Sequence, residues 1–143
     1  MKRLHLTTLS LALALAACSS TTTKPDNDIQ EIYVQNPKNT ISWTGTYQGI
    51  TPCANCDGIA TMIILKPNLE YQMRTRMLGI EEVDQKSEGT FAWQTNNTHI
   101  EILPEDGIPK IYRVNNDFIE LTLPNGEQIP TNDPEQYRLY KTD

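Results

Sequence analysis

Apolar and polar residues alternate along most of the chain after residue 41, with the period of two that is typical of half-buried β-strands. The pattern is clearest over residues 69–78. One face of this segment carries Leu69, Tyr71, Met73, Thr75 and Met77. The other face carries Glu70, Gln72, Arg74 and Arg76. A strand of this kind packs one face on a core, so Arg74 and Arg76 are expected in solvent and not in a binding site.

The same alternation, interrupted by turn signals such as Pro124-Asn125-Gly126, predicts about eight short strands. They are Ser42–Tyr47, Ile59–Leu65, Leu69–Leu78, Gly89–Gln94, His99–Leu103, Lys110–Val114, Phe118–Leu123 and Gln136–Lys141. No segment has a convincing helical period. Short strands at this spacing predict an all-β fold, either an antiparallel barrel or a sandwich.

The chain begins differently, with Lys2-Arg3 followed by an apolar run that becomes continuous over residues 11–17. A basic start, a short apolar run and small residues at its end are typical of a secretory signal peptide. The run ends in Leu15-Ala16-Ala17-Cys18, which resembles the bacterial lipobox. This resemblance implies cleavage after residue 17 and lipidation of Cys18.

Three segments follow from this interpretation. Residues 1–17 are the signal peptide, residues 18–40 are the lipid anchor and a polar, flexible tether, and residues 41–143 are the folded domain. Two or more acyl chains on Cys18 hold a domain stably at a bilayer. Ser19 stands where an inner-membrane retention signal has Asp, so the lipobox resemblance implies the outer membrane, with the domain facing the periplasm or the cell surface.

The net charge and the length of the apolar runs argue against two classes of protein, those that bind nucleic acids and those that span a membrane. The formal net charge is −6, and the leader contributes only positive charge, so the mature chain is more acidic still. Phosphate backbones repel such a chain, which argues against nucleic-acid binding. Outside the leader no apolar run approaches the roughly 20 residues that a spanning helix needs. The sequence therefore predicts a membrane-tethered protein and not a membrane-spanning one.

Cys53 and Cys56 remain once Cys18 is assigned to the anchor. An even pair in an exported protein is expected to form a disulfide. Thiolates and thioethers also select Cu(I), so the pair is a candidate copper site. Thiol–disulfide exchange is a weaker alternative, because Gly58 and a β-branched strand follow where a redox motif has a helix.

Two cysteines are an incomplete copper site. The candidate additional ligands are Met62, Met73, Met77 and His99. If Ile63 faces Met73 across the turn at Lys66-Pro67-Asn68, then Met77 lies beside the cysteine loop. If the register shifts by one residue, Met62 opposes Met73 instead, and the sequence alone leaves both registers open.

No catalytic signature is present: the sequence contains no GxSxG, HExxH or P-loop pattern, and its acidic residues are scattered or in loop-like runs. We therefore expect that the protein is not an enzyme.

The segment Pro52-Cys53-Ala54-x-Cys56-x-Gly58-Ile59, preceded by Tyr47-x-Gly49, resembles the N-terminal domain family of the copper-resistance lipoprotein NlpE. Gly89-Thr90-Phe91-x-Trp93 and Leu121-x-Leu123-x-x-Gly126 also match the pattern of this family. The resemblance covers about residues 43–141 and implies a small lipocalin-like β-barrel. It further implies an outer-membrane lipoprotein tied to copper tolerance and envelope-stress signalling. Larger members carry a second, C-terminal domain, which this chain lacks, so it resembles a short form.

Three functions are compatible with these observations. The first is a binding or sensing module in envelope copper or redox homeostasis that uses the Cys53/Cys56 loop, with Cu(I) as a candidate ligand. The second is a carrier for a small hydrophobic ligand, since barrels of about eight strands can hold one. The third is a structural or adhesion-related lipoprotein with an inert disulfide. An envelope protein partner and a homodimer are both left open by the sequence.

Overall fold

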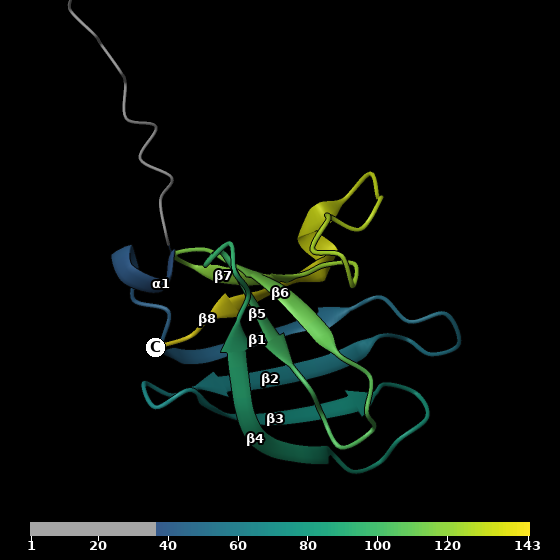
Figure 1. Ribbon diagram of the computed structural model, residues 1–143. Coiled ribbons are helices and arrows are strands. Elements are labelled where there is room, and N and C mark those ends of the chain that lie inside the picture. Colours follow the sequence, from purple (N-terminus) through teal and green to yellow (C-terminus); the bar gives the residue numbers. More distant parts are fainter. Residues whose placement is uncertain (1–36) are drawn as a thin grey trace, which may run out of the picture. The chain divides into compact units, whose positions relative to one another are not determined.

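The computed structural model describes residues 37–143 (Figure 1). The predicted signal peptide 1–17, the lipidation site Cys18 and the tether as far as residue 36 lie outside the described residues, so these expectations stay predictions. Residues 37–40, at the end of the predicted tether, form the short helix α1 (Pro37–Thr40). No helix within residues 37–143 is long and apolar enough to cross a bilayer.

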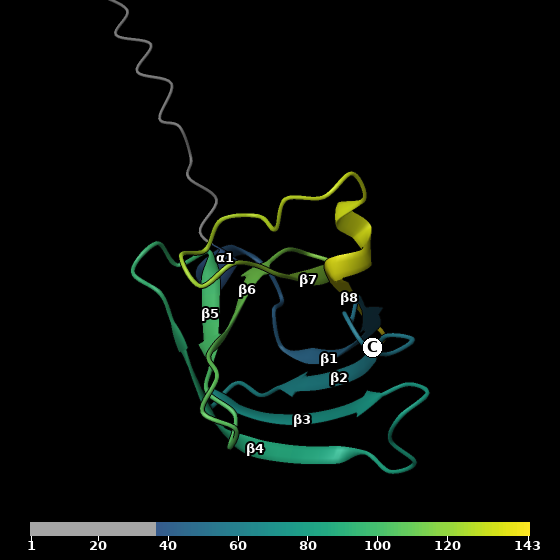
Figure 2. The same cartoon turned by 90° about the vertical axis from the view of Figure 1, so that its right-hand side faces the viewer.

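Eight antiparallel strands close into a barrel in which each strand pairs with its neighbours in sequence. The strands are β1 (Gly45–Thr51), β2 (Ile59–Leu65), β3 (Glu70–Met77), β4 (Gln85–Trp93), β5 (His99–Ile102), β6 (Lys110–Val114), β7 (Phe118–Leu121) and β8 (Arg138–Lys141). A 3₁₀-helix, η1 (Pro134–Tyr137), precedes β8. Strands β1 to β4 form one curved wall, and β5 to β7 cross on its other side (Figure 2). The predicted all-β barrel of about eight strands is confirmed.

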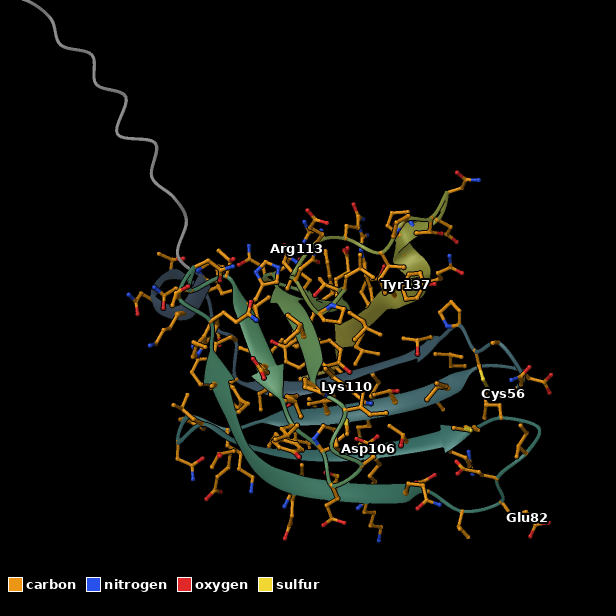
Figure 3. All side chains as sticks on the ribbon, turned by 45° about the vertical axis from the view of Figure 1, so that its right-hand side comes forward. Cys56, Glu82, Asp106, Lys110, Arg113 and Tyr137 are labelled. Carbon is orange, nitrogen blue, oxygen red and sulfur yellow. A yellow bond between two sulfur atoms is a disulfide. The ribbon has the colours of Figure 1, made fainter. Side chains whose placement is uncertain are left out.

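Inward side chains of all eight strands contribute to the buried core, and Figure 3 draws the side chains on the ribbon. The buried core consists of Tyr47, Ile63, Leu65, Tyr71, Met73, Phe91, Ile100, Ile102, Tyr112, Val114, Ile119 and Leu139. Ile63 pairs with Met73 and Ile59 with Met77, so the first of the two registers considered from sequence is the one observed. Since the closed sheet and its core lie within residues 37–143, this segment contains what a domain needs to fold alone.

The largest differences from the predicted strand boundaries are in β4 and β1, and the other strands differ by two residues or fewer at either end. β4 begins at Gln85, four residues before the predicted Gly89, because main-chain pairing with β3 continues through a polar stretch, with Met73 opposite Ser87. β1 runs over Gly45–Thr51 instead of 42–47, and Thr51 pairs with Ile59. Both strands therefore extend further toward the end of the barrel that holds the cysteine loop than the apolar pattern indicates.

The barrel closes where β8 meets β1, with Tyr47 opposite Lys141 and Gln48 opposite Tyr140. A Cβ atom on Gly49 would lie 2.5 Å from the carbonyl oxygen of Arg138, so any side chain at this position would push the two strands apart. The Asp143 carboxylate accepts a hydrogen bond of 2.6 Å from the Thr46 N–H, and this bond lowers the pKa of Asp143. The last described residue thus fastens the start of the first strand.

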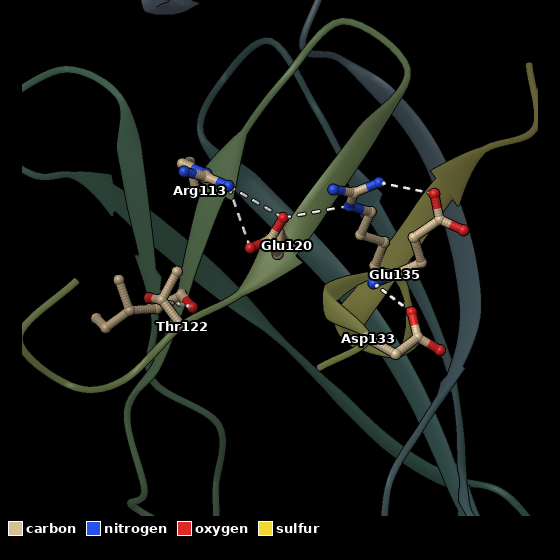
Figure 4. A network of polar contacts seen from close by, with 7 residues as sticks. Arg113, Glu120, Thr122, Asp133 and Glu135 are labelled. Carbon is tan, nitrogen blue, oxygen red and sulfur yellow. Dashed lines mark hydrogen bonds and ion pairs between the residues drawn. The ribbon is translucent and has the colours of Figure 1, made fainter. Parts of the chain in front are cut away.

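The buried carboxylate of Glu120 in β7 binds arginines of the neighbouring strands β6 and β8 on the outer face of the barrel (Figure 4). Glu120 is 1% exposed, and both of its oxygens lie 3.1 Å from Nη2 of Arg113. Nε of Arg138 donates to Glu120 at 3.2 Å, and its guanidinium lies 4.4 Å from the centre of the Phe118 ring. Arg113 and Arg138 flank Glu120 in the sheet register, so the ion pairs connect three neighbouring strands.

We predict that Glu120→Gln lowers the free energy of unfolding by about 2 kcal/mol, because the two arginines lose a desolvated charge partner while the shape is kept. Urea unfolding followed by circular dichroism measures this loss.

Glu135→Gln is the matched control. Glu135 contacts the same Arg138, at 3.3 Å, but its side chain is 69% exposed, so the same substitution is expected to cost less than about 0.5 kcal/mol. Equal losses in the two variants would show that burial of Glu120 contributes nothing special.

Candidate functional site

The cysteine loop connects β1 to β2 at one end of the barrel, and Figure 3 shows Cys56 at this end near Glu82 of the β3–β4 connection. Cys53 and Cys56 form a disulfide with a Cα–Cα distance of 5.3 Å, within the usual range for such bonds. Both cysteines are half-buried, whereas Ala54 and Asn55 between them are exposed. The sulfur atoms are therefore supported by the barrel and still close to solvent.

Backbone hydrogen bonds hold the loop against the end of β3. The Asp57 N–H donates to the Leu78 carbonyl at 3.0 Å, and the Leu78 N–H donates to the Gly58 carbonyl at 2.9 Å. Gly58 has a φ of +136°, and a Cβ there would lie 2.6 Å from Ile50, so this position requires glycine. Cys56 Sγ lies 3.3 Å from the Gly58 oxygen, where a reduced thiol would have an acceptor within reach.

Met77 is the one candidate sulfur ligand that the structure places beside this loop. It pairs with Ile59, the first residue of β2 after the loop, and its side chain is 42% exposed. Met73 lies four residues back along the same strand, roughly 13 Å away at the normal rise of a strand. It is buried in the core, so Met73 and Met77 do not form a pair at the loop.

Met62 and His99 lie elsewhere. Met62 is opposite Arg74 on the outward face of β2 and β3. His99 begins β5, after a turn whose Asn97 carbonyl accepts from the Lys38 N–H of α1. Since α1 precedes β1 and the cysteine loop follows β1, His99 is at the opposite end of the barrel. The structure places Met77 at the end of β3 beside the loop that carries Cys53 and Cys56, and it places Met62, Met73 and His99 elsewhere. Within residues 37–143 no three side chains of His, Cys, Asp and Glu form a metal-binding cluster.

The surroundings of His99 favour its neutral form over its protonated form. Its Nδ1 lies 3.0 Å from the Asn96 amide nitrogen and 2.8 Å from the Thr98 hydroxyl, and Arg113 is opposite it in the sheet. The Asn96 amide can only donate, so Nδ1 accepts and the proton is on Nε2. Burial lowers the pKa of His99 below 6.5, and the positive charge of Arg113 lowers it further, against a raising contribution from the Gly126 backbone.

A cavity of about 540 Å³ opens at the same end of the barrel as the cysteine loop. Thr51 and Ile59, which flank the loop, belong to its wall together with Met73, Met77 and Tyr112. A cavity fits the hydrophobic-carrier alternative considered from the sequence, but its position beside the cysteine loop was not predicted. One feature of the sequence could have indicated the cavity. Small hydroxyl residues such as Thr61 in β2 and Thr75 in β3 occupy inward positions near the strand ends, where a filled core would have larger apolar side chains.

The family model described as the NlpE N-terminal domain matches residues 47–132. The chain belongs to this family. It is 26% identical over 84 residues to lipoprotein NlpE of Escherichia coli K12, an alignment that covers 59% of this chain and 36% of that relative. The chain thus spans about a third of the length of that NlpE protein.

Two solved structures of lipoproteins share the fold. The crystal structure of a putative lipoprotein from Shewanella oneidensis matches with a TM-score of 0.66 and 30% identity, covering 75% of this chain and 95% of that one. The crystal structure of the Cpx pathway activator NlpE from Escherichia coli matches with a TM-score of 0.54 and 27% identity, covering 63% and 46%. The resemblance to NlpE seen in the sequence is confirmed.

The environment of His99 predicts a pH dependence of stability. Because the folded pKa lies below the ordinary 6.5, the unfolded chain takes up a proton first as the pH falls. The contribution of His99 to the free energy of unfolding should therefore be fully present well above pH 6.5. As the pH falls below 6.5, the free energy of unfolding should decrease by up to roughly 1.4 kcal/mol per pH unit, until the pKa of His99 in the folded protein is reached.

Urea unfolding of residues 19–143 at several pH values between about 7.5 and 5.5 tests this, since His99 is then the only histidine. His99→Gln should remove the slope in this range. A slope that persists in this variant would assign the pH dependence to other groups.

Proposed function

We propose that this NlpE-family domain is a lipid-anchored, non-enzymatic sensor or binding module that responds to copper or to redox state in the bacterial envelope. The observation that carries the proposal is the half-buried Cys53–Cys56 pair on a loop fastened to β3 beside Met77. Reduction would supply two soft thiolate ligands next to a soft thioether, which is the donor chemistry that Cu(I) prefers.

Several features of the proposal rest on family membership and on the leader. Its location is the outer membrane, with Cys18 as the lipid anchor. An envelope protein partner fits the name of the Escherichia coli relative, which is a Cpx pathway activator. This chain matches less than half of that relative, so any signalling function that depends on the rest of it is a separate question.

The disulfide is expected to contribute little to the fold, because closing so short a loop restricts the unfolded chain by only about 2 kcal/mol. A Cys53→Ser/Cys56→Ser variant should therefore remain folded. This makes it a suitable control for thiol chemistry.

We predict that reduced residues 19–143 bind one Cu(I), and that the double serine variant does not. Met77→Leu should weaken this binding roughly tenfold, equivalent to about 1.4 kcal/mol, because it removes the thioether nearest the loop. Met62→Leu is the matched control and should leave the affinity unchanged, since Met62 lies on the outer face opposite Arg74. Competition with a Cu(I) chelator gives the affinities.

A free-thiol count before and after mild reductant completes the experiment. The proposal is contradicted if the disulfide resists mild reductant and the protein still binds no copper after full reduction with a strong reductant. The pair would then be a structural link. Reducible thiols without copper binding would retain the redox response and reject the copper one.

A further inference from the structure

The cavity at the open end of the barrel has the size and wall of a small-molecule site. Its volume of about 540 Å³ falls within the roughly 300–1,000 Å³ typical of ligand pockets, which are frequent in the mouths of β-barrels. Ile59, Met73, Met77 and Leu121 supply apolar wall. The cysteine loop is next to this cavity, but neither Cys53 nor Cys56 belongs to its lining.

Tyr112 lines the cavity and carries a hydroxyl group. Its side chain is 3% exposed, and its hydroxyl has no hydrogen-bond partner among the described residues. Burial raises the pKa of Tyr112, so the hydroxyl is protonated and can both donate and accept. Buried tyrosine hydroxyls are usually paired, so an unpaired one on a residue that lines a cavity is a candidate partner for a polar atom of a bound molecule.

Charge is confined to the entrance. The charged residues of the lining are Glu81, Lys86, Glu105, Asp106 and Lys110. None of them is buried, and Lys110 pairs with Asp106 at 3.7 Å. Figure 3 shows Asp106 and Lys110 close to each other. Every buried residue of the lining is uncharged, so an ionised ligand group would lose its hydration inside without gaining a charge partner.

We propose that this cavity binds a small, uncharged, largely apolar molecule that carries one hydrogen-bonding group, with that group on the Tyr112 hydroxyl. The apolar part lies between the Met73/Met77 side of β3 and Leu121. Binding of this kind is a second activity of the domain, at a site separate from the two sulfur atoms.

The test uses two fluorescent probes on residues 19–143. N-phenyl-1-naphthylamine is uncharged and apolar and has one N–H group, and 8-anilino-1-naphthalenesulfonate has the same skeleton with an added negative charge. The first probe should bind saturably at one site, and the second at least roughly tenfold more weakly, since a buried charge would be unpaired.

Two variants locate the binding site. Thr75→Trp places a large side chain on the wall of the cavity and should abolish binding, while Thr95→Trp makes the same change at an exposed position in the β4–β5 turn and should not. Tyr112→Phe should weaken binding roughly 2- to 10-fold, as expected for one lost hydrogen bond, and it keeps the fold. If Thr75→Trp does not fold, the affinity of the Tyr112→Phe variant for the probe tests whether binding occurs in the cavity.

The proposal is overturned if the uncharged probe does not bind saturably, if the sulfonate binds equally well, or if neither Thr75→Trp nor Tyr112→Phe changes the affinity. The Cys53→Ser/Cys56→Ser variant separates this site from the thiol function. Probe binding that survives in this variant, together with lost Cu(I) binding, shows that ligand binding in the cavity does not require the two cysteines.

Discussion

The short seam between β1 and β8 is the contact on which the rest of the structure depends. It joins the two ends of the sheet through Tyr47 opposite Lys141 and Gln48 opposite Tyr140. Tyr47 and Leu139, one from each side of the seam, are fully buried, so an open sheet would expose the core to water. Gly49 makes the close approach possible, because the Arg138 carbonyl occupies the space of a side chain. Closure also removes the free edges that make open sheets prone to aggregation.

The two ends of the closed barrel differ in how they are filled. At the end near α1, Trp43 packs edge-on against both Phe91 and Trp93, with ring centres 5.7 Å apart in each pair. Aromatic contacts of this kind bury much surface and fill that end. The other end holds the cysteine loop and the cavity. A well-packed end near α1 is compatible with a cavity at the opposite end.

The sequence predicted the parts of this molecule that follow from local alternation. The strand at Leu69–Leu78 is the strongest case, because its inward and outward residues match the pleat of the observed β3. The predicted start of β4 at Gly89 was wrong. The strand begins at Gln85, since hydrogen bonding to β3 continues there without apolar side chains. η1 was also not predicted: its Asp133 cap and Pro134 are local signals, but four residues show no period.

Site residues were harder to predict, because their grouping depends on register and on long-range pairing. The sequence could name Met62, Met73 and Met77 as sulfur ligands, but only the pairing of Ile59 with Met77 selects one of them. His99 was a candidate by residue type, and the meander places it at the far end, next to the turn that contacts α1. The unpaired Tyr112 hydroxyl had no signal at all, since a tyrosine at an inward strand position is normally part of a core.

The order of the strands also determines when the barrel can form. Seven of its eight pairings join strands that are neighbours in the sequence. Six of these need a connection of only seven residues or fewer, whereas β7 and β8 are joined by residues 122–137, which include η1. The eighth joins Tyr47 to Lys141 across nearly the whole domain. Loop-closure entropy makes such a distant contact the slow step. During synthesis, the hairpins can assemble one after another as the chain emerges, but the core stays exposed until the final strand has left the ribosome.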